Sequence, residues 1–207
     1  MKVLMLNGSP HKTGCTNRAL TEIADELAEH GIDSEILWLG NQPVRDCIAC
    51  GQCAETDGRC VFDDDSVNEI IEKAKTSDGF VFGTPVYYAH ANGRILSVLD
   101  RVFYAGGKYF AHKPGAAVAS ARRAGTTASV DVLNKYFTIN QMPVVSSTYW
   151  NMVHGNTAQE VEQDLEGLQT MRNRASNRAW LLFCIEAGRE RGVCPPKNQK
   201  VATTFIR

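Results

Sequence analysis

The segment of residues 7–17 constrains the fold of this chain more than any other part of its sequence. It reads Asn-Gly-Ser-Pro-His-Lys-Thr-Gly-Cys-Thr-Asn, follows the apolar run of residues 3–6 and precedes a helical pattern that begins near Thr16. A loop that joins a buried strand to a helix N-terminus is a natural anion site, because unpaired backbone N–H groups and the helix dipole both face the ligand. The groups that this loop offers to a phosphate monoester are the hydroxyls of Ser9, Thr13 and Thr16, the Asn17 amide and the Lys12 ammonium.

The glycines of this loop exclude two familiar nucleotide-binding motifs. Gly8 and Gly14 do not form the G-x-G-x-x-G fingerprint of dinucleotide-binding domains, and no Gly-Lys-Ser/Thr triplet closes a P-loop. A strand-to-helix turn that binds nothing also fits the loop taken alone. Evidence from the rest of the chain is therefore needed to decide whether the loop is a phosphate site or a purely structural turn.

Short apolar runs alternate with amphipathic stretches along the chain. We expect strands at residues 2–6, 34–39, 79–83, 115–120 and 144–149, and helices at residues 16–29, after the acidic segment 63–66, and at residues 92–103, 126–140 and 157–191. This alternation predicts an α/β fold, in which a five-stranded, mostly parallel sheet is covered by helices on both faces. On the last helix, Cys184 is expected to lie in the core with Trp180, Leu181 and Ile185.

Length and charge narrow the class of protein. The 207 residues suit a single domain over residues 1–207, and 43% hydrophobic with 22% charged residues is ordinary for globular proteins. Lys and Arg number 22 against 23 Asp and Glu, so no basic surface indicates a nucleic-acid partner. No apolar run is long enough to span a bilayer and no signal peptide is apparent, so we expect a cytoplasmic protein without a membrane partner.

Four of the seven cysteines are gathered in one segment. Cys47, Cys50, Cys53 and Cys60 lie in a loop expected over residues 40–62, with the spacing C-x2-C-x2-C-x6-C. An odd total and a cytoplasmic setting argue against a disulfide framework and favour metal binding or redox chemistry. Four thiolates in one loop suit a [4Fe–4S] cluster, which cysteines usually hold. Tetrahedral zinc and a loop without metal are the alternatives.

Three loops are expected to meet at one edge of the sheet. In open parallel sheets, ligands bind beyond the carboxyl ends of the strands, near the switch in strand order. This rule selects the loop after the first strand, residues 84–93 after the third strand and residues 121–126 after the fourth. They supply a phosphate cradle, a proline loop with aromatic residues and a basic loop with a glycine. A planar heteroaromatic ligand that carries a phosphate would use all three.

Several motifs follow one another along the chain in an informative order. They are Gly8-Ser9-Pro10-His11-Lys12-x-Gly14-x-Thr16, Gly83-Thr84-Pro85-Val86-Tyr87, Gly93-Arg94-x-Leu96 with Asp100-Arg101, Arg122-Arg123-x-Gly125, and Ala179-Trp180-Leu181-Leu182. In order and spacing they resemble the flavodoxin-like NAD(P)H-dependent FMN reductases, and within them the iron–sulfur flavoproteins. The resemblance spans nearly the whole chain and implies a three-layer, flavodoxin-like sandwich.

The resemblance also implies a binding site for FMN. Its phosphate would be held by Ser9, His11, Thr16 and Asn17, its ring would lie against Pro85, Val86 and Tyr87, and Ser120, Arg122 and Gly125 would flank its other side. Two positions depart from the family pattern, because His11 stands where arginine is usual and Cys15 where asparagine is usual. Histidine is only partly charged near neutral pH, so phosphate binding is expected to depend on pH.

The function expected of such a protein rests on its cofactor rather than on acid–base side chains, so we nominate no catalytic residue. We expect an oxidoreductase that takes hydride from NAD(P)H and passes electrons to a quinone, a nitroaromatic compound or free flavin. The alternative is an electron carrier in which FMN and a [4Fe–4S] cluster shuttle electrons between partner redox proteins. In the resembling family the cysteine loop often approaches the flavin of a neighbouring subunit, which implies a homodimer or homotetramer.

Overall fold

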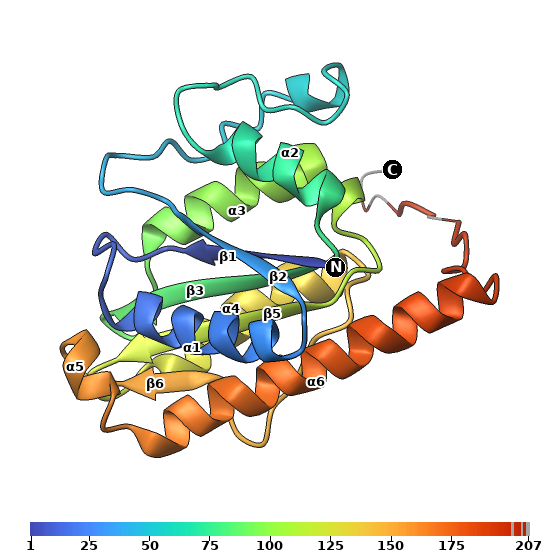
Figure 1. Ribbon diagram of the computed structural model, residues 1–207. Coiled ribbons are helices and arrows are strands. Elements are labelled where there is room, and N and C mark those ends of the chain that lie inside the picture. The colour runs from blue at the N-terminus through green and yellow to red at the C-terminus, as the bar shows by residue number, and fades with distance from the viewer. Residues whose placement is uncertain (200, 204, 206–207) are drawn as a thin grey trace.

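The computed structural model of the chain alternates strands and helices over residues 1–199, 201–203 and 205, the part that is described (Figure 1). The strands are β1 (Lys2–Asn7), β2 (Asp33–Trp38), β3 (Gly79–Tyr87), β4 (His90–Ala91), β5 (Gly115–Ala121) and β6 (Met152–His154). The helices are α1 (Cys15–Glu29), α2 (Val67–Thr76), α3 (Gly93–Gly106), α4 (Thr126–Ile139), α5 (Ala158–Val161) and α6 (Leu165–Glu190), with short 3-10 turns η1 (Gln52–Ala54) and η2 (Gly107–Tyr109).

Five parallel strands form the sheet in the order β2-β1-β3-β5-β6. Numbered along the chain, these parallel strands have the 2-1-3-4-5 order of flavodoxin-like folds. β1 lies between β2 and β3, with Val3 opposite Ser34 on one side and Gly79 on the other. The order of the strands switches between β1 and β3, so their carboxyl ends open a crevice where the ligand loops are expected.

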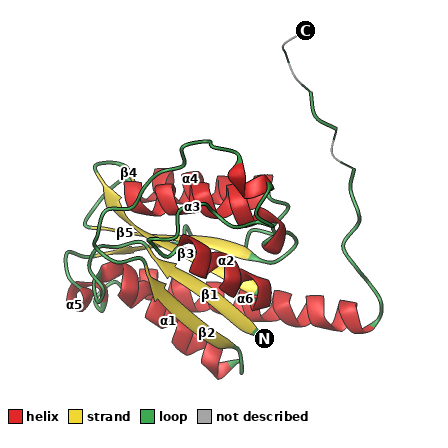
Figure 2. Cartoon of the chain, turned by 90° about the horizontal axis from the view of Figure 1, so that it is seen from above, coloured by secondary structure: helices red, strands yellow, loops and turns green. Residues whose placement is uncertain are grey.

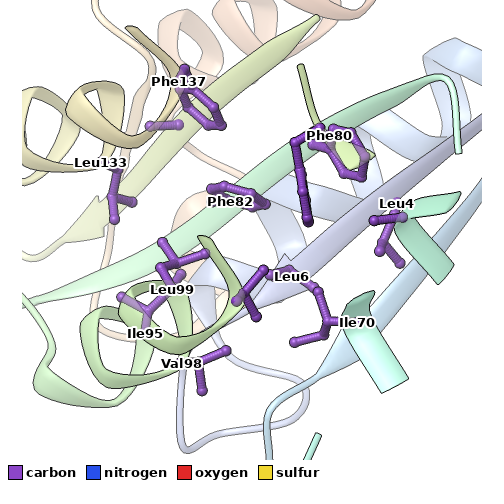
Figure 3. Packing of buried hydrophobic residues seen from close by; sticks show 14 of the residues in the cluster. Leu4, Leu6, Ile70, Phe80, Phe82, Ile95, Val98, Leu99, Leu133 and Phe137 are labelled. Atoms are coloured by element: carbon purple, nitrogen blue, oxygen red, sulfur yellow. The ribbon is translucent and has the colours of Figure 1, made fainter. Parts of the chain in front are cut away.

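Two layers of helices cover the sheet, because successive side chains of a strand point to opposite faces. Leu4 and Leu6 of β1 pack with α2, α3 and α4, whereas Val3 and Met5 pack with α1 and α6. Figure 3 shows the first of these clusters, in which Phe82 of β3 lies among side chains of the covering helices α3 and α4. Figures 1 and 2 show the helices on both faces of the sheet. The α/β, flavodoxin-like architecture predicted from the sequence is therefore confirmed.

The strand predicted at residues 144–149 is wrong. Only its start pairs with β5, where Val144 forms an isolated bridge with Gly115. The chain then leaves the sheet, and Ser147 Oγ donates a hydrogen bond to the Thr170 carbonyl of α6 at 2.7 Å. It returns as β6, which pairs with the end of β5. β-branched and hydroxyl residues gave this detour the composition of a strand, but its polar groups bond to α6.

Two other boundaries differ from the sequence prediction. The strand expected at residues 79–83 continues to Tyr87 and turns back as β4, a short antiparallel strand that the sequence did not indicate. The helix expected over residues 157–191 is divided into α5 and α6. Asp164 caps the start of α6 by accepting the Gly167 amide at 3.0 Å. In the part of the chain that is described, no helix combines the length and the apolar composition that crossing a membrane requires.

The buried side of α6 is not the side that the sequence predicted. Cys184 is exposed and Trp180 is 68% exposed, so neither lies in the core. The buried stripe instead passes through Ala175 and includes Arg174 and Arg178, both of which are fully buried. Charged residues are seldom buried in a protein core. A helix face that carries two arginines is therefore expected to be exposed, and for this reason the sequence prediction chose the wrong face.

Candidate functional site

A cleft of about 450 Å³ opens at the carboxyl edge of the sheet, where the loops after β1, β3, β5 and β6 converge. This volume is in the range of small-molecule and cofactor sites. The residues that line it are Ser9, His11, Gly14, Cys15, Thr16, Pro85, Val86, Tyr87, Ser120, Ala121, Arg122, Gly155 and Asn156. The three loops selected from the sequence therefore meet at one cavity, and a fourth segment joins them.

The loop after β1 is curled by its own side chains. The Asn7 carboxamide oxygen accepts the Ser9 amide at 3.0 Å, and Ser9 Oγ accepts the His11 amide at 3.1 Å. Trp38 of β2 holds the loop from outside, because its indole N–H donates to the Ser9 carbonyl at 2.8 Å. These bonds fix the backbone of the loop at the rim of the cleft.

The N-terminus of α1 faces this cleft without a side-chain cap. Its N-cap residue is Gly14, which offers no oxygen to the first amides of the helix. The first amides of a helix have no partner within the helix and carry the positive end of its dipole. Because Gly14, Cys15 and Thr16 all line the cleft, an anion placed there would meet these amides.

Two buried hydroxyls join the loop after β1 to the end of β5. Thr16 Oγ1 and Ser120 Oγ lie 2.8 Å apart, and the two residues are 1% and 3% exposed. One hydroxyl donates to the other, which leaves one O–H free to donate elsewhere. Both residues line the cleft, so this free donor adds to the amides of α1 as a group that recognises an anion.

The loop after β3 forms a tight hairpin at the opposite side of the cleft. Tyr87 pairs with His90, and the two residues between them make the turn. Tyr88 adopts a φ of 59° at this turn and its side chain is fully exposed. A two-residue hairpin turn favours positive φ, although most side chains resist it. Tyr87 itself is 49% exposed, so the hairpin presents an open aromatic surface beside the cleft.

Gly125 supports this hairpin from the neighbouring loop. Its φ is +90°, and a Cβ at this position would lie 2.7 Å from Val86 Cγ1 and 2.8 Å from Ala89 Cα. Only glycine satisfies both the backbone conformation and the close approach. Gly125 therefore sets how closely the loop after β5 approaches the hairpin, although it does not itself line the cleft.

Eight of the ten residues predicted to bind the cofactor line this cleft. Asn17 and Gly125 were predicted to bind the ligand and do not line the cleft; Asn17 instead bonds to Asn7 and Thr21. The predicted residues that do line it are Ser9, His11, Thr16, Pro85, Val86, Tyr87, Ser120 and Arg122. Gly155 and Asn156 were missed, because they follow β6 and the last strand had been placed at residues 144–149. The Gly-Asn pair after a short apolar run was the signal that could have located them.

Cys15 is the second residue at which this loop departs from the family pattern. Its thiol donates to the Gly155 carbonyl at 3.4 Å, and so links α1 to the segment after β6. Burial raises the pKa of the Cys15 thiol. A raised pKa disfavours the reactive thiolate form of this side chain.

A second cavity, of about 140 Å³, lies inside the cysteine loop. All four predicted ligands, Cys47, Cys50, Cys53 and Cys60, line it and are free thiols. Over residues 1–199, 201–203 and 205, no three His, Cys, Asp or Glu side chains are grouped closely enough to hold a single metal ion. The sulfurs therefore lie around the cavity wall rather than at one point. The remaining lining residues are Ile48, Ala49, Gly51, Val61, Phe62, Arg101, Tyr104 and Ala105.

Cys60 is the most firmly held of the four cysteines. The buried Asn68 of α2 accepts the Cys60 amide at 2.8 Å and donates to the Cys60 carbonyl at 3.0 Å. Asn68 also donates to the Phe62 carbonyl at 3.1 Å. The last cysteine of the loop is therefore fixed to the helix that follows it, an anchor that no sequence motif indicated.

The strand order, the cleft beyond the carboxyl ends and the uncapped α1 N-terminus define a flavodoxin-like protein with a site for a phosphorylated cofactor. The family model for NADPH-dependent FMN reductase matches residues 1–157. An iron–sulfur flavoprotein of Methanocaldococcus jannaschii is 32% identical over 194 residues, which cover 90% of this chain and 100% of that protein. The iron–sulfur flavoprotein of Methanosarcina thermophila is 29% identical over 195 residues, covering 92% and 100%.

The chain belongs to the NADPH-dependent FMN reductase family and matches its iron–sulfur flavoproteins along nearly its whole length. A solved structure, the NAD(P)H:quinone oxidoreductase from Methanothermobacter marburgensis, superposes with a TM-score of 0.64 at 16% identity, covering 87% of this chain and 96% of that one. At this identity the likeness shows the fold alone. The family supports an FMN-dependent oxidoreductase, as the sequence predicted.

Proposed function

We propose that this protein takes hydride from NAD(P)H onto FMN and passes the electrons to a small acceptor such as a quinone, a nitroaromatic compound or free flavin. The observation that carries the proposal is the cleft, which joins an uncapped helix N-terminus to an open aromatic hairpin. FMN supplies the hydride and electron chemistry when bound. The chain itself has to bind the phosphate, orient the ring and leave one face open.

The phosphate is assigned to the α1 end of the cleft. The amides of Cys15 and Thr16, the hydroxyl pair of Thr16 with Ser120 and the Ser9 hydroxyl are the donors there. His11 is exposed at the rim and adds positive charge when protonated. Apart from His11, these donors are uncharged, so binding depends on several hydrogen bonds rather than on one ion pair.

The ring is assigned to the hairpin side of the cleft. Pro85 and Val86 give it an apolar wall, and the half-exposed Tyr87 leaves room for a nicotinamide or an acceptor to stack. Arg122 is exposed at the same cleft, where its charge favours a reduced, anionic flavin or the phosphates of NAD(P)H.

A second function, electron carriage through a [4Fe–4S] cluster, is favoured by the cysteine cavity. A cubane takes one thiolate at each iron, and here four cysteines surround one cavity. Zinc would require the four sulfurs to converge on a single ion. Cys47, Cys50, Cys53 and Cys60 are therefore proposed as the cluster ligands, and a redox protein as the electron partner.

A homodimer or homotetramer is also proposed, because the cleft and the cysteine cavity lie apart within one chain. The loop after β1, which lines the cleft, is tied to the start of α3, where Asn92 caps the helix and donates to the Gly8 carbonyl at 2.6 Å. The cysteine cavity contacts α3 at Arg101, and a helix rises about 14 Å between these two positions. The two centres of one chain are thus held apart, which favours electron exchange with a neighbouring subunit.

Anaerobic purification tests both functions in one preparation. The absorption spectrum, the iron and sulfide content and the rates of NADH and NADPH oxidation with each acceptor class are measured together. Bound flavin with rapid NAD(P)H oxidation supports the reductase, and about four irons and four sulfides per chain support the cluster. Flavin that neither NADH nor NADPH bleaches would overturn the reductase, and absence of iron would overturn the carrier.

A further inference from the structure

Arg101 of α3 lies beneath the cysteine cavity in a position unusual for an arginine. It is only 2% exposed, although arginine is almost never fully buried without a partner. It lines the cavity together with the four cysteines. The groups that contact Arg101 explain why a charged side chain is kept at this buried position.

The guanidinium of Arg101 ties together both ends of the cysteine loop. Nη1 donates to the Arg45 carbonyl at 3.2 Å, just before the first cysteine, and Nη2 donates to the Phe62 carbonyl at 3.3 Å, just after the last. Nε donates to Cys60 Sγ at 3.3 Å. One side chain thus closes the loop and contacts one of its sulfurs directly.

The charge of Arg101 is balanced on the side away from the sulfur. Asp65 forms an ion pair with Nη1, and this carboxylate is itself largely buried, with 12% of its side chain exposed. Asp65 also accepts the Val67 amide at 3.1 Å through its other oxygen, so the start of α2 holds the carboxylate in place. The guanidinium therefore presents an N–H to Cys60 while the neutralising charge lies beyond it.

Other cysteines of the loop lack such a donor among the described residues. Cys53 Sγ is itself a donor, and its partner is the Tyr104 carbonyl at 3.7 Å. A hydrogen bond donated to a ligand sulfur withdraws electron density from it and favours the reduced cluster. Outer partners of this kind also orient the ligand they contact. Arg101 combines both effects at Cys60.

We propose that Arg101 is a positioning residue for Cys60 that raises the reduction potential of the cluster, with Asp65 moderating its effect. This inference rests on the proposed [4Fe–4S] cluster. The cluster is held by thiolates, so an adjacent cation stabilises the form that carries one more electron. Removing the cation lowers the potential, whereas removing the balancing carboxylate raises it.

The test is an anaerobic redox titration of the reconstituted protein, followed by electron paramagnetic resonance for the cluster and by absorbance for FMN. Arg101→Gln is expected to lower the cluster potential by about 59 mV, a tenfold change for a one-electron couple. Asp65→Asn keeps the oxygen that accepts the Val67 amide and is expected to shift the potential upward. Arg94→Gln is the matched control, because Arg94 lies on the same helix and donates to Gln42 of the same loop without contacting a cysteine.

The two variants are expected to shift the cluster potential in opposite directions. This separates an electrostatic role from structural damage, which would shift the potential of both variants in the same direction. Unchanged cluster potentials, or shifts of one sign in both variants, overturn the role of Arg101. If Arg101→Gln holds no cluster, Asp65→Asn decides alone, and a potential that does not rise overturns the inference. Wild-type protein without iron overturns the cluster and this role together, whereas a normal cluster with unmoved potentials overturns only the role.

Discussion

Removing the hydroxyls at the α1 end of the cleft tests how the chain holds a phosphate. The double variant Ser9→Ala with Thr16→Val deletes two donors and keeps the volume of the threonine side chain. Thr16 is paired with Ser120 at 2.8 Å, so one O–H of the pair is free for a ligand. A hydrogen bond to a charged group contributes about 1.5–3 kcal/mol, and Ser120 keeps an O–H that can replace the one lost with Thr16, so one to two lost bonds cost about 1.5–6 kcal/mol. At about 1.4 kcal/mol for each tenfold change, FMN binding weakens by roughly 10- to 10⁴-fold.

The assay is a titration of apoprotein with FMN, in which quenching of flavin fluorescence reports binding. Thr13→Ala is the matched control, because Thr13 is an exposed hydroxyl of the same loop that does not line the cleft. The double variant also loses the bond from the His11 amide to Ser9 Oγ, so urea unfolding must show that it remains folded. A folded double variant with the wild-type Kd would refute the assignment of the phosphate to this end.

Four further predictions concern separate parts of the chain. Arg174→Met should stabilise the protein by about 1–4 kcal/mol in urea unfolding, because all three guanidinium nitrogens are buried without a hydrogen-bond partner among the described residues; a loss of stability contradicts this. Gly125→Ala should weaken FMN binding by displacing the hairpin, which titration measures against wild type. Cys50→Ser should abolish the iron content of the purified protein while flavin stays bound. Iron at full occupancy in this variant would show that the cluster ligands are other residues. Lys2 and Lys73 lower the pKa of Glu35. Ionised Glu35 therefore adds to the free energy of unfolding above the ordinary carboxyl pKa, and this stabilisation is lost as the pH falls through the lowered pKa. The difference in unfolding free energy between wild type and Glu35→Gln should close on acidification.

The fold was predictable because its signals are local and repeated. The run at residues 3–6 is buried on both faces, with Leu4 and Leu6 against one helical layer and Val3 against the other. Continuous apolar strands that alternate with amphipathic helices admit few architectures. The ligand loops followed from the carboxyl-end rule once the strands were placed, and His11 and Pro85 of these loops line the same cleft.

The errors arose where tertiary contacts override local pattern. Residues 144–149 have strand composition, yet Ser147 bonds to α6 instead of the sheet, and this displaced the last strand. Gly155 and Asn156 were lost from the predicted site for the same reason. Arg174 and Arg178 are buried in a helix whose other side carries the exposed Trp180, so the large aromatic residue indicated the wrong face as the buried one. The contact from Arg101 to Cys60 joins residues 41 positions apart, and no short-range pattern encodes it.

Comparing riboflavin with FMN tests the central claim most directly, because the two ligands differ only in the phosphate. If the amides of α1 and the Thr16–Ser120 pair clasp that group, calorimetry on the apoprotein will find riboflavin bound at least about 100-fold more weakly, the loss of two bonds to a charged group. Equal affinities for the two ligands would contradict the account.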